Sequence, residues 1–182
     1  MSRTSHSAHL RDGSIQDADA LIALDSVAAN DPGRALQIGD WLARGGVQVA
    51  EQNGRAVGYL VIHHHFFGEA FVEMLMVAHA QRGQGIGTAL LRQAIALHGR
   101  RKLFTSTNAS NIGMQHLLTA HGFVGSGILH GLDEGAPELI YRLASAEQLS
   151  RKAVNQDRQT CHGLSPPPPR LSRERAWERA HA

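Results

Sequence analysis

The feature that most constrains the fold of this chain is a glycine-rich stretch between an apolar segment and a helical pattern. Residues 71–77 are apolar apart from Glu73, which suits a buried strand. Alternate positions then hold Gly83, Gly85 and Gly87, and apolar residues recur at helical spacing over residues 86–97. Glycines at the start of a helix let the backbone approach a ligand and leave amide N–H groups free for an anion such as a phosphate. The stretch therefore predicts a strand, a phosphate-binding loop and a helix, in that order.

Two common nucleotide-binding patterns fit this loop poorly. A kinase-type P-loop ends in Gly-Lys-Ser/Thr, whereas Gly87 is followed by Thr88 with no lysine. A dinucleotide fingerprint needs a third glycine where Thr88 stands and an acidic residue about 20 positions further on. Residues 102–107, which cover that place, carry no acid. A plain glycine-rich turn that ends a strand is the remaining alternative, but strand, loop and helix occur in the order that phosphate binding requires.

Apolar periodicity and turn residues predict further helices and strands over most of the chain. We expect strands at residues 9–12, 47–51, 56–64, 71–77, 103–107, 123–127 and 138–143. We expect helices at residues 14–24, 34–44, 86–98 and 112–121, with residues 30–33 forming a break. Asn53-Gly54 is a strong two-residue hairpin signal, so three consecutive antiparallel strands lead into the glycine loop.

Two motifs in this order resemble the GCN5-related N-acetyltransferase (GNAT) family. The loop Arg82-Gly83-Gln84-Gly85-Ile86-Gly87 is similar to the family's Gln/Arg-x-x-Gly-x-Gly/Ala pyrophosphate loop. The segment that starts at Asn111 and ends in Gly122-Phe123 is similar to a second family segment. The resemblance covers residues 9–143 and implies an α/β fold with a GNAT-type mixed, mostly antiparallel sheet flanked by helices. It also implies an acyltransferase that moves an acetyl group from acetyl-CoA to a primary amine.

The resemblance places the acetyl-CoA site on the strand, the glycine loop and the later helix. The diphosphate is expected on the loop amides, and the pantetheine arm is expected to pair with the strand backbone as an added strand would. A backbone N–H of the strand would then stabilise the oxyanion. The predicted coenzyme-binding residues are Leu75, Val77, Arg82, Gly83, Gln84, Gly85, Ile86, Gly87, Thr88 and Asn111. Arg82 is expected to pair with a phosphate, although a solvated surface arginine is the alternative.

Transfer to an amine needs a base that removes the ammonium proton, and Glu73 is the candidate. It is the one acid in the apolar strand that leads to the donor site, and the alternative is a glutamate held in a salt bridge at the sheet edge. Some family members place a glutamate on the next strand, near Ser106 of this chain. Many carry a tyrosine that protonates the leaving thiolate, and this chain has Leu118 there. Leu118 keeps open an alternative function, a non-catalytic acyl-CoA-binding or regulatory module.

The sequence leaves the acceptor amine unidentified, whether a small molecule or a peptide. Three acids would flank the acceptor groove and attract a cationic amine: Asp133, Glu134 and Glu138. His63-His64-His65 invites a metal interpretation, but only His63 and His65 can share a strand face, and no Cys or carboxylate stands beside them at ligand spacing. We therefore expect no metal site, and we interpret Cys161 as incidental.

Charge and composition divide the chain into an acetyltransferase-type domain, residues 1–147, and a proline-rich basic extension, residues 148–182, which we expect to be disordered. Residues 151–182 hold seven of the 18 Lys+Arg and three of the 16 Asp+Glu, so they carry +4 and the other residues −2. A nucleic-acid-binding domain would carry its basic patch on the folded part, so we expect no nucleic-acid partner. The single cysteine, the lack of a long apolar run and the lack of a secretory signal predict a cytoplasmic protein without membrane contact. The sequence leaves the oligomeric state open, with a homodimer as one option.

Overall fold

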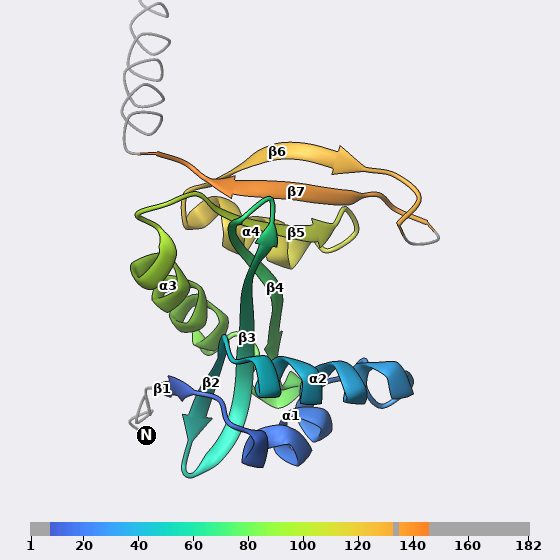
Figure 1. Ribbon diagram of the computed structural model, residues 1–182, viewed down its shortest axis with the longest axis vertical. Helices are drawn as coiled ribbons and strands as arrows, with labels where there is room; N and C mark the ends of the chain where they lie inside the picture. Colours follow the sequence, from blue (N-terminus) through green and yellow to red (C-terminus); the bar gives the residue numbers. More distant parts are fainter. Residues whose placement is uncertain (1–7, 133–134, 146–182) are drawn as a thin grey trace, which may run out of the picture. The chain divides into compact units, whose positions relative to one another are not determined.

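The computed structural model describes residues 8–132 and 135–145 of the chain. This part holds a seven-stranded sheet with the strand order β1-β2-β3-β4-β5-β7-β6 (Figure 1). The strands are β1 His9–Asp12, β2 Val47–Gln52, β3 Arg55–Phe66, β4 Glu69–Val77, β5 Leu103–Asn108, β6 Phe123–Leu129 and β7 Glu138–Leu143. The helices are α1 Ala18–Leu24, α2 Pro32–Arg44, α3 Ile86–His98 and α4 Ile112–Ala120, with short 3-10 turns η1 Ile15–Asp17 and η2 His79–Gln81.

The sheet is mixed and mostly antiparallel, as predicted. Every neighbouring pair of strands runs antiparallel except β4 and β5, which are parallel and are joined through α3. The β4–β5 pairing is short and covers only Ala70–Val72 against Leu103–Thr105. At its last rung the Thr105 hydroxyl donates to the Val72 carbonyl oxygen at 2.9 Å. Beyond Val72 the two strands do not pair, which leaves the rest of β4 without a partner strand on that side.

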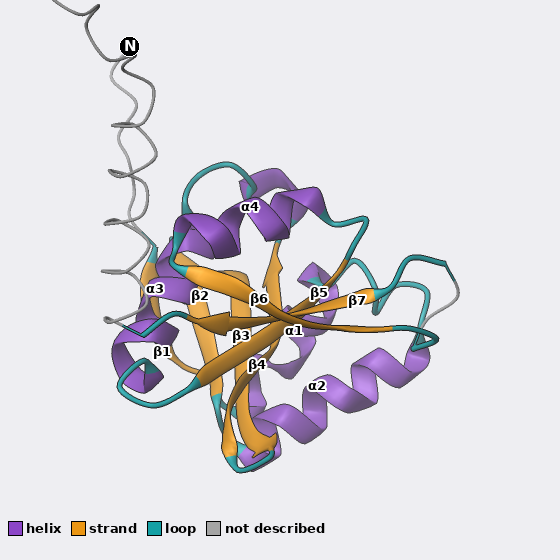
Figure 2. Cartoon of the chain, turned by 90° about the horizontal axis from the view of Figure 1, so that it is seen from above, coloured by secondary structure: helices purple, strands orange, loops and turns teal. Residues whose placement is uncertain are grey.

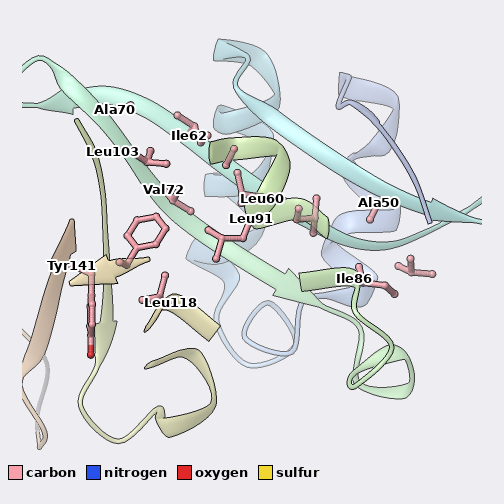
Figure 3. Packing of buried hydrophobic residues seen from close by; sticks show 14 residues of the cluster. Ala50, Leu60, Ile62, Ala70, Val72, Ile86, Leu91, Leu103, Leu118 and Tyr141 are labelled. Carbon is pink, nitrogen blue, oxygen red and sulfur yellow. The ribbon is translucent and has the colours of Figure 1, made fainter. Parts of the chain in front are cut away.

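Helices pack on both faces of the sheet, with α1 and α2 on one and α3 and α4 on the other (Figure 2). Neighbouring residues of β3 show the alternation that this requires: Tyr59 and Val61 belong to the cluster with α1 and α2, while Leu60 and Ile62 belong to the cluster with α3 and α4. Figure 3 shows the second cluster, in which Leu91 of α3 and Leu118 of α4 pack with strand residues. Burial on both faces explains why these strands are continuous apolar runs in the sequence.

A close contact at Gly58 sets the position of α3 on the sheet. A Cβ atom at this position would lie 2.8 Å from the Met76 carbonyl oxygen and 3.2 Å from a side-chain carbon of Ile86. A side chain here would clash with the β4 backbone and crowd Ile86 of α3, so glycine suits the close approach of β3 to both elements. The helix start that follows the glycine loop is fixed against the sheet by this contact.

The predicted elements are present, with shifted ends. The predicted break at residues 30–33 is wrong in part, because α2 already begins at Pro32. Asp31 caps this helix by accepting from the Gly33 N–H at 2.8 Å, and proline suits the first helical position, where its missing N–H is not needed. Strands β3 and β6 also run two residues further than predicted, to Phe66 and Leu129. No helix within the described residues is long and apolar enough to cross a membrane.

Hydrogen bonds of the Arg11 side chain connect β1 to the turn before α1. Arg11 donates two hydrogen bonds to the Asp17 carboxylate, at 2.7 and 3.0 Å, and a third to Glu51 of β2 at 2.9 Å. The Ser14 N–H donates to the same Asp17 carboxylate at 2.8 Å. The Arg11 hydrogen bonds, opposed by burial, lower the pKa of Asp17 from 3.8 to about 2.

We expect Asp17→Asn to lower the free energy of unfolding at pH 7 by about 1–2 kcal/mol, because the charge-assisted pair is lost. The pKa of Asp17 is depressed in the folded state, so its contribution is present above pH 3.8 and is lost as the pH falls through about 2. The deficit of the variant should therefore shrink over that interval. Urea titrations at several pH values measure this, with Asp19→Asn, an exposed acid of α1, as the control. An equal deficit at pH 7 and pH 2 would contradict the assignment.

The described residues up to Ala144 belong to one compact unit. The predicted boundary at residues 147/148 and the predicted disorder of the extension fall outside the described residues and stay predictions. We expect a chain that ends at Ser145 to melt at the same temperature as the full chain, because the two core clusters lie before this residue. Differential scanning calorimetry of both chains tests this, and a clear loss of melting temperature on truncation would move the domain boundary.

Candidate active site

The candidate site is organised by a β-bulge in β4. Along the β3–β4 ladder Val61 pairs with Met74, and the next residue, Ile62, pairs with Val72, so Glu73 is an extra residue without a partner. A bulge of this kind changes which face the following residues occupy. Val72 packs in the cluster with α3 and α4, whereas Met74 packs against the cluster with α1 and α2. Glu73 contacts Trp41 of α2, so it and its neighbour Met74 face the same side of the sheet.

Beyond the bulge, β4 presents backbone groups on its open side. The Ala78 N–H donates to the Val57 carbonyl oxygen at 2.9 Å at the end of the β3–β4 ladder. Because antiparallel ladders alternate, the N–H and C=O groups of Leu75 and Val77 point away from β3. This is the side where β4 has already separated from β5. These two backbone positions, predicted to pair with pantetheine, are thus directed into the gap between the strands.

The glycine loop leads directly into the N-terminus of α3. Gly83 and Gly85 have φ values of +75° and +82°, which other residues rarely adopt, and Gly85 is the N-cap of the helix. Since glycine has no side chain to cap the helix, the N–H groups of the first turn at Ile86, Gly87 and Thr88 are left without intrahelical acceptors. Together with the helix dipole, they form an anion-binding surface.

A cleft of about 790 Å³ lies where the open side of β4 meets the starts of α3 and α4, and we call it the β4–α4 cleft. It is lined by Met74, Leu75, Met76, Val77, Gln81, Arg82, Gly83, Gly85, Ile86, Gly87, Thr88, Asn111, Gly113, Met114 and Leu117. All predicted coenzyme-binding residues line it except Gln84. The exposed Gln84 side chain instead donates to the Ala80 carbonyl oxygen at 3.3 Å. The residues predicted from the sequence thus come together in the β4–α4 cleft, although they belong to two helices, a strand and a loop.

Arg82 and Asn111 already have intramolecular partners in this cleft. The Arg82 Nε–H donates to the Val77 carbonyl oxygen at 3.2 Å, so this side chain lies over the open edge of β4. Asn111 is the N-cap of α4, and its side-chain oxygen accepts from the Met114 N–H at 3.1 Å. The amide oxygen of Asn111 is committed to the helix, which leaves its NH₂ group for a ligand. Sequence reasoning missed this capping role, although asparagine before a helix is a usual signal for it.

A second cleft, of about 690 Å³, lies between α2 and the far half of β3, and we call it the α2–β3 cleft. It is lined by Gln37, Asp40, Trp41, Arg44, Gly45, Gly46, Gln48, Val61, Ile62, His63, His64, His65, Glu73 and His98. Glu73 thus lines one cleft and its neighbour Met74 the other, so the two clefts adjoin at the bulge.

Glu73 is half-buried, with its side chain 32% exposed. Its Oε2 atom accepts a hydrogen bond from the Trp41 indole N–H at 3.1 Å. The Nε2 atom of His63 lies 3.6 Å from the same oxygen, which is an ion-pair distance rather than a hydrogen bond. The alternative interpretation, a glutamate held in a salt bridge, agrees only with the longer contact to His63. The nearest partner of Glu73 is the neutral indole of Trp41.

His63 is neutral near pH 7, because burial lowers the pKa of its imidazole and outweighs the opposing effect of Glu73. The backbone N–H of His65 donates to the His63 Nδ1 atom at 3.1 Å. In the neutral ring Nδ1 is therefore the acceptor, and the proton sits on Nε2, toward Glu73. The rings of His63 and His65 stack with centroids 5.3 Å apart, whereas His64 lies against His98 of α3. This confirms that only His63 and His65 share a strand face. Within the described residues, no group of three or more His, Cys, Asp or Glu side chains is arranged to hold a metal ion.

Leu118, at the position of the family's usual tyrosine, is fully buried in the core and does not line the β4–α4 cleft, whereas its neighbour Leu117 does. No side chain lining that cleft is a phenol. Of the other predicted residues, Ser106 and Glu138 line neither cleft, and Asp133 and Glu134 lie outside the described residues. Of the acids predicted to flank the acceptor, the described one, Glu138, does not line the α2–β3 cleft, where Asp40 accompanies Glu73.

The sequence matches the family model described as "Acetyltransferase (GNAT) family" over residues 19–123. The chain belongs to this family. It is 33% identical over 116 residues to the L-2,4-diaminobutyric acid acetyltransferase of Nocardia farcinica, a match that spans 55% of this chain and 59% of that relative. These findings confirm the family predicted from the loop and from the segment that follows Asn111.

Solved structures of the family share the fold. An acetyltransferase of the GNAT family from Bacillus cereus ATCC 10987 superposes with a TM-score of 0.69 at 30% identity, over 74% of this chain and 95% of that one. The ribosomal-protein-S18-alanine N-acetyltransferase of Escherichia coli gives 0.66 at 19% identity, over 76% and 96%. The diaminobutyrate acetyltransferase EctA of Paenibacillus lautus, in complex with L-2,4-diaminobutyric acid and coenzyme A, gives 0.59 at 21%, over 75% and 94%. The described part thus corresponds to nearly the whole of these acetyltransferase chains.

We expect Gly87→Glu to abolish binding of acetyl-CoA. A Cβ atom at Gly87 would lie 3.5 Å from Leu75 and 3.6 Å from Leu117, in ordinary contact, so the substitution folds but directs a carboxylate into the β4–α4 cleft. The matched control is Leu97→Glu, which adds the same charge at a 60% exposed position of the same helix. Calorimetric titration gives the affinity of each protein. Unchanged affinity in the Gly87 variant would show that acetyl-CoA does not occupy this cleft.

Proposed function

We propose that this chain transfers an acetyl group from acetyl-CoA to a primary amine, with the donor in the β4–α4 cleft and the amine in the α2–β3 cleft. The observation that carries this proposal is that consecutive residues at the β4 bulge line the two clefts, Glu73 the α2–β3 cleft and Met74 the β4–α4 cleft. A thioester at the end of one cleft and an amine in the other would meet beside the one carboxylate of the bulge. Membership of the acetyltransferase family agrees with this arrangement.

The donor would be held by groups that the free protein presents. The first-turn amides of α3 suit the diphosphate, and the outward backbone groups of Leu75 and Val77 suit the amides of the pantetheine arm. Arg82 would have to leave the Val77 carbonyl oxygen for the arm to pair there, and its guanidinium is then free to bind a phosphate. The first turn of α3 and Arg82 would thus bind the phosphates, and the β4 backbone would bind the pantetheine arm of the same ligand.

In the reaction, Glu73 takes a proton from the acceptor ammonium, and the free amine attacks the thioester carbonyl carbon. A C–N bond forms, the attacking nitrogen loses its second proton to water, the C–S bond breaks, and coenzyme A leaves as a thiolate. A backbone N–H on the open side of β4 is suitably directed to stabilise the oxyanion of the tetrahedral intermediate. Since Leu118 is buried and the β4–α4 cleft has no phenol, the thiolate takes its proton from water or from a residue other than a tyrosine of that cleft.

The acceptor we favour is a small cationic amine. Glu73 supplies negative charge to the α2–β3 cleft, whereas Asp40 is paired with Arg44 at 2.7 Å, and Gln37 adds a neutral polar group. The relative from Nocardia farcinica is named for L-2,4-diaminobutyric acid, a small diamino acid, which makes this compound the first to test. A peptide amine as acceptor, the cytoplasmic location and a homodimer stay predictions from the sequence.

A non-catalytic acyl-CoA-binding module is the second candidate, and the buried leucine at the tyrosine position favours it. The two functions differ in turnover. Incubation with acetyl-CoA and a panel of amines that includes L-2,4-diaminobutyrate, with release of free thiol as the readout, separates them. Tight binding of acetyl-CoA without thiol release for any amine would support the binding module.

We expect Glu73→Gln to lower kcat by about 10²–10⁴ and to leave the Kd for acetyl-CoA unchanged, because a general base is removed while the β4–α4 cleft is untouched. The acid limb of the kcat/KM profile should also be lost. The matched control is Glu69→Gln on the same strand, since Glu69 is similarly exposed, pairs with Lys102 at 3.5 Å and lines neither cleft. A Glu73 variant with wild-type turnover and pH profile would place the base elsewhere.

A further inference from the structure

We propose that Trp41 of α2 is a positioning residue for the catalytic base, holding one oxygen of Glu73 through its indole N–H so that the other oxygen faces the acceptor. This inference rests on the proposed function, because it assigns a purpose to the neighbours of the base. Trp41 lies 32 positions before Glu73 in the sequence, and it belongs to α2 whereas Glu73 belongs to β4.

The contacts of the two carboxylate oxygens of Glu73 differ. Oε2 accepts from Trp41 at 3.1 Å and has His63 at 3.6 Å. Within the described residues Oε1 receives no hydrogen bond. A carboxylate that is bound through one oxygen and open through the other has a fixed orientation and one basic atom available. This is the arrangement that removal of a proton from a bound ammonium requires.

Glu73 needs such an external support because of its place in the strand. As the extra residue of the bulge it has no partner in the β3–β4 ladder, and its side chain is 32% exposed. Its rotatable side chain would otherwise sample several orientations in the α2–β3 cleft. One charge-assisted hydrogen bond from a rigid ring removes most of that freedom.

Trp41 is itself held firmly, so it can serve as a fixed donor. It is only 7% exposed and belongs to the core cluster that α1 and α2 form with the sheet. The Arg34 guanidinium lies 5.4 Å from the centre of its ring, and the Tyr59 ring lies 6.4 Å away. The Tyr59 hydroxyl donates to Asp25 at 2.6 Å, which fixes that neighbour in turn. The indole N–H, buried with the ring, is thus directed at Glu73 by the packing of α2.

His63 does not replace Trp41 in this role. Its Nε2 atom carries the proton in the neutral ring and lies beyond hydrogen-bond distance from Glu73. With that nitrogen already protonated and Nδ1 bonded to the His65 N–H, neutral His63 cannot accept a proton from Glu73. The other charged or titratable groups that line the cleft are Asp40 and Arg44 of α2, His64 and His65 of β3, and His98 of α3. Arg44 and Asp40 pair with each other at 2.7 Å.

The test is Trp41→Phe, which keeps an aromatic ring and removes the N–H donor. We expect kcat to fall about 10- to 100-fold with an unchanged KM for acetyl-CoA, because the base is misplaced while the donor cleft is intact. The control is Asp17→Asn, which destabilises the same domain without contacting Trp41 or Glu73. It should lower the melting temperature and leave kcat and the KM for acetyl-CoA at their wild-type values.

A second measurement uses the wild-type protein, so it does not depend on the folding of the Trp41 variant. The chain has two tryptophans, Trp41 and Trp177, so the indole N–H resonances are easily assigned by NMR. The Trp41 resonance should shift with pH at the midpoint of the acid limb, and Glu73→Gln should abolish that shift. Wild-type kcat in a folded Trp41→Phe protein would overturn the inference, as would a Trp41 resonance that responds to pH in the same way in the wild-type protein and in Glu73→Gln. If instead wild-type protein releases no thiol with any amine, the proposed function fails, and the NMR titration still reports on the contact.

Discussion

The arrangement of this site depends on one extra residue in β4. Without the bulge at Glu73, strict alternation would place Val72 and Met74 on the same face, and the apolar pattern of the strand could not serve both core clusters. With the bulge, the residues after it keep their burial while Glu73 is turned toward α2. The same irregularity occurs where β4 leaves β5, so the carboxylate and the open backbone edge occur on adjacent residues. A single local defect in the ladder therefore brings the elements of both clefts together.

The sequence predicted the fold and the residues of one cleft because their signals are local. Strand, glycine loop and helix are contiguous, and the glycines at 83 and 85 do adopt the backbone conformation that favours glycine. The later segment supplied Asn111, which caps α4 and lines the same cleft. The ends of elements were less predictable, as at Pro32, because a proline that begins a helix and a proline in a turn look alike without the cap geometry.

The surroundings of Glu73 could not be predicted, because they are not local. An apolar strand buried on both faces shows no alternation in its sequence, so the bulge leaves no trace in the pattern. Trp41 contacts Glu73 only because α2 packs across that face of the sheet, and the sequence marks Trp41 simply as a residue available for burial. Likewise, the resemblance to the family identifies Leu118 as an exception, but only the packing shows that it belongs to the core.

The separation of β4 from β5 has a second consequence, for solubility. An unpaired strand edge offers its N–H and C=O groups to any extended chain, and such edges promote self-association. Sheets commonly protect their edges with long cationic side chains, whose charge repels a second copy of the same edge. Arg82 lies in this manner over the Val77 carbonyl group. The arginine thus covers this edge against a second copy of the chain, and in the proposed complex the pantetheine arm would cover it instead.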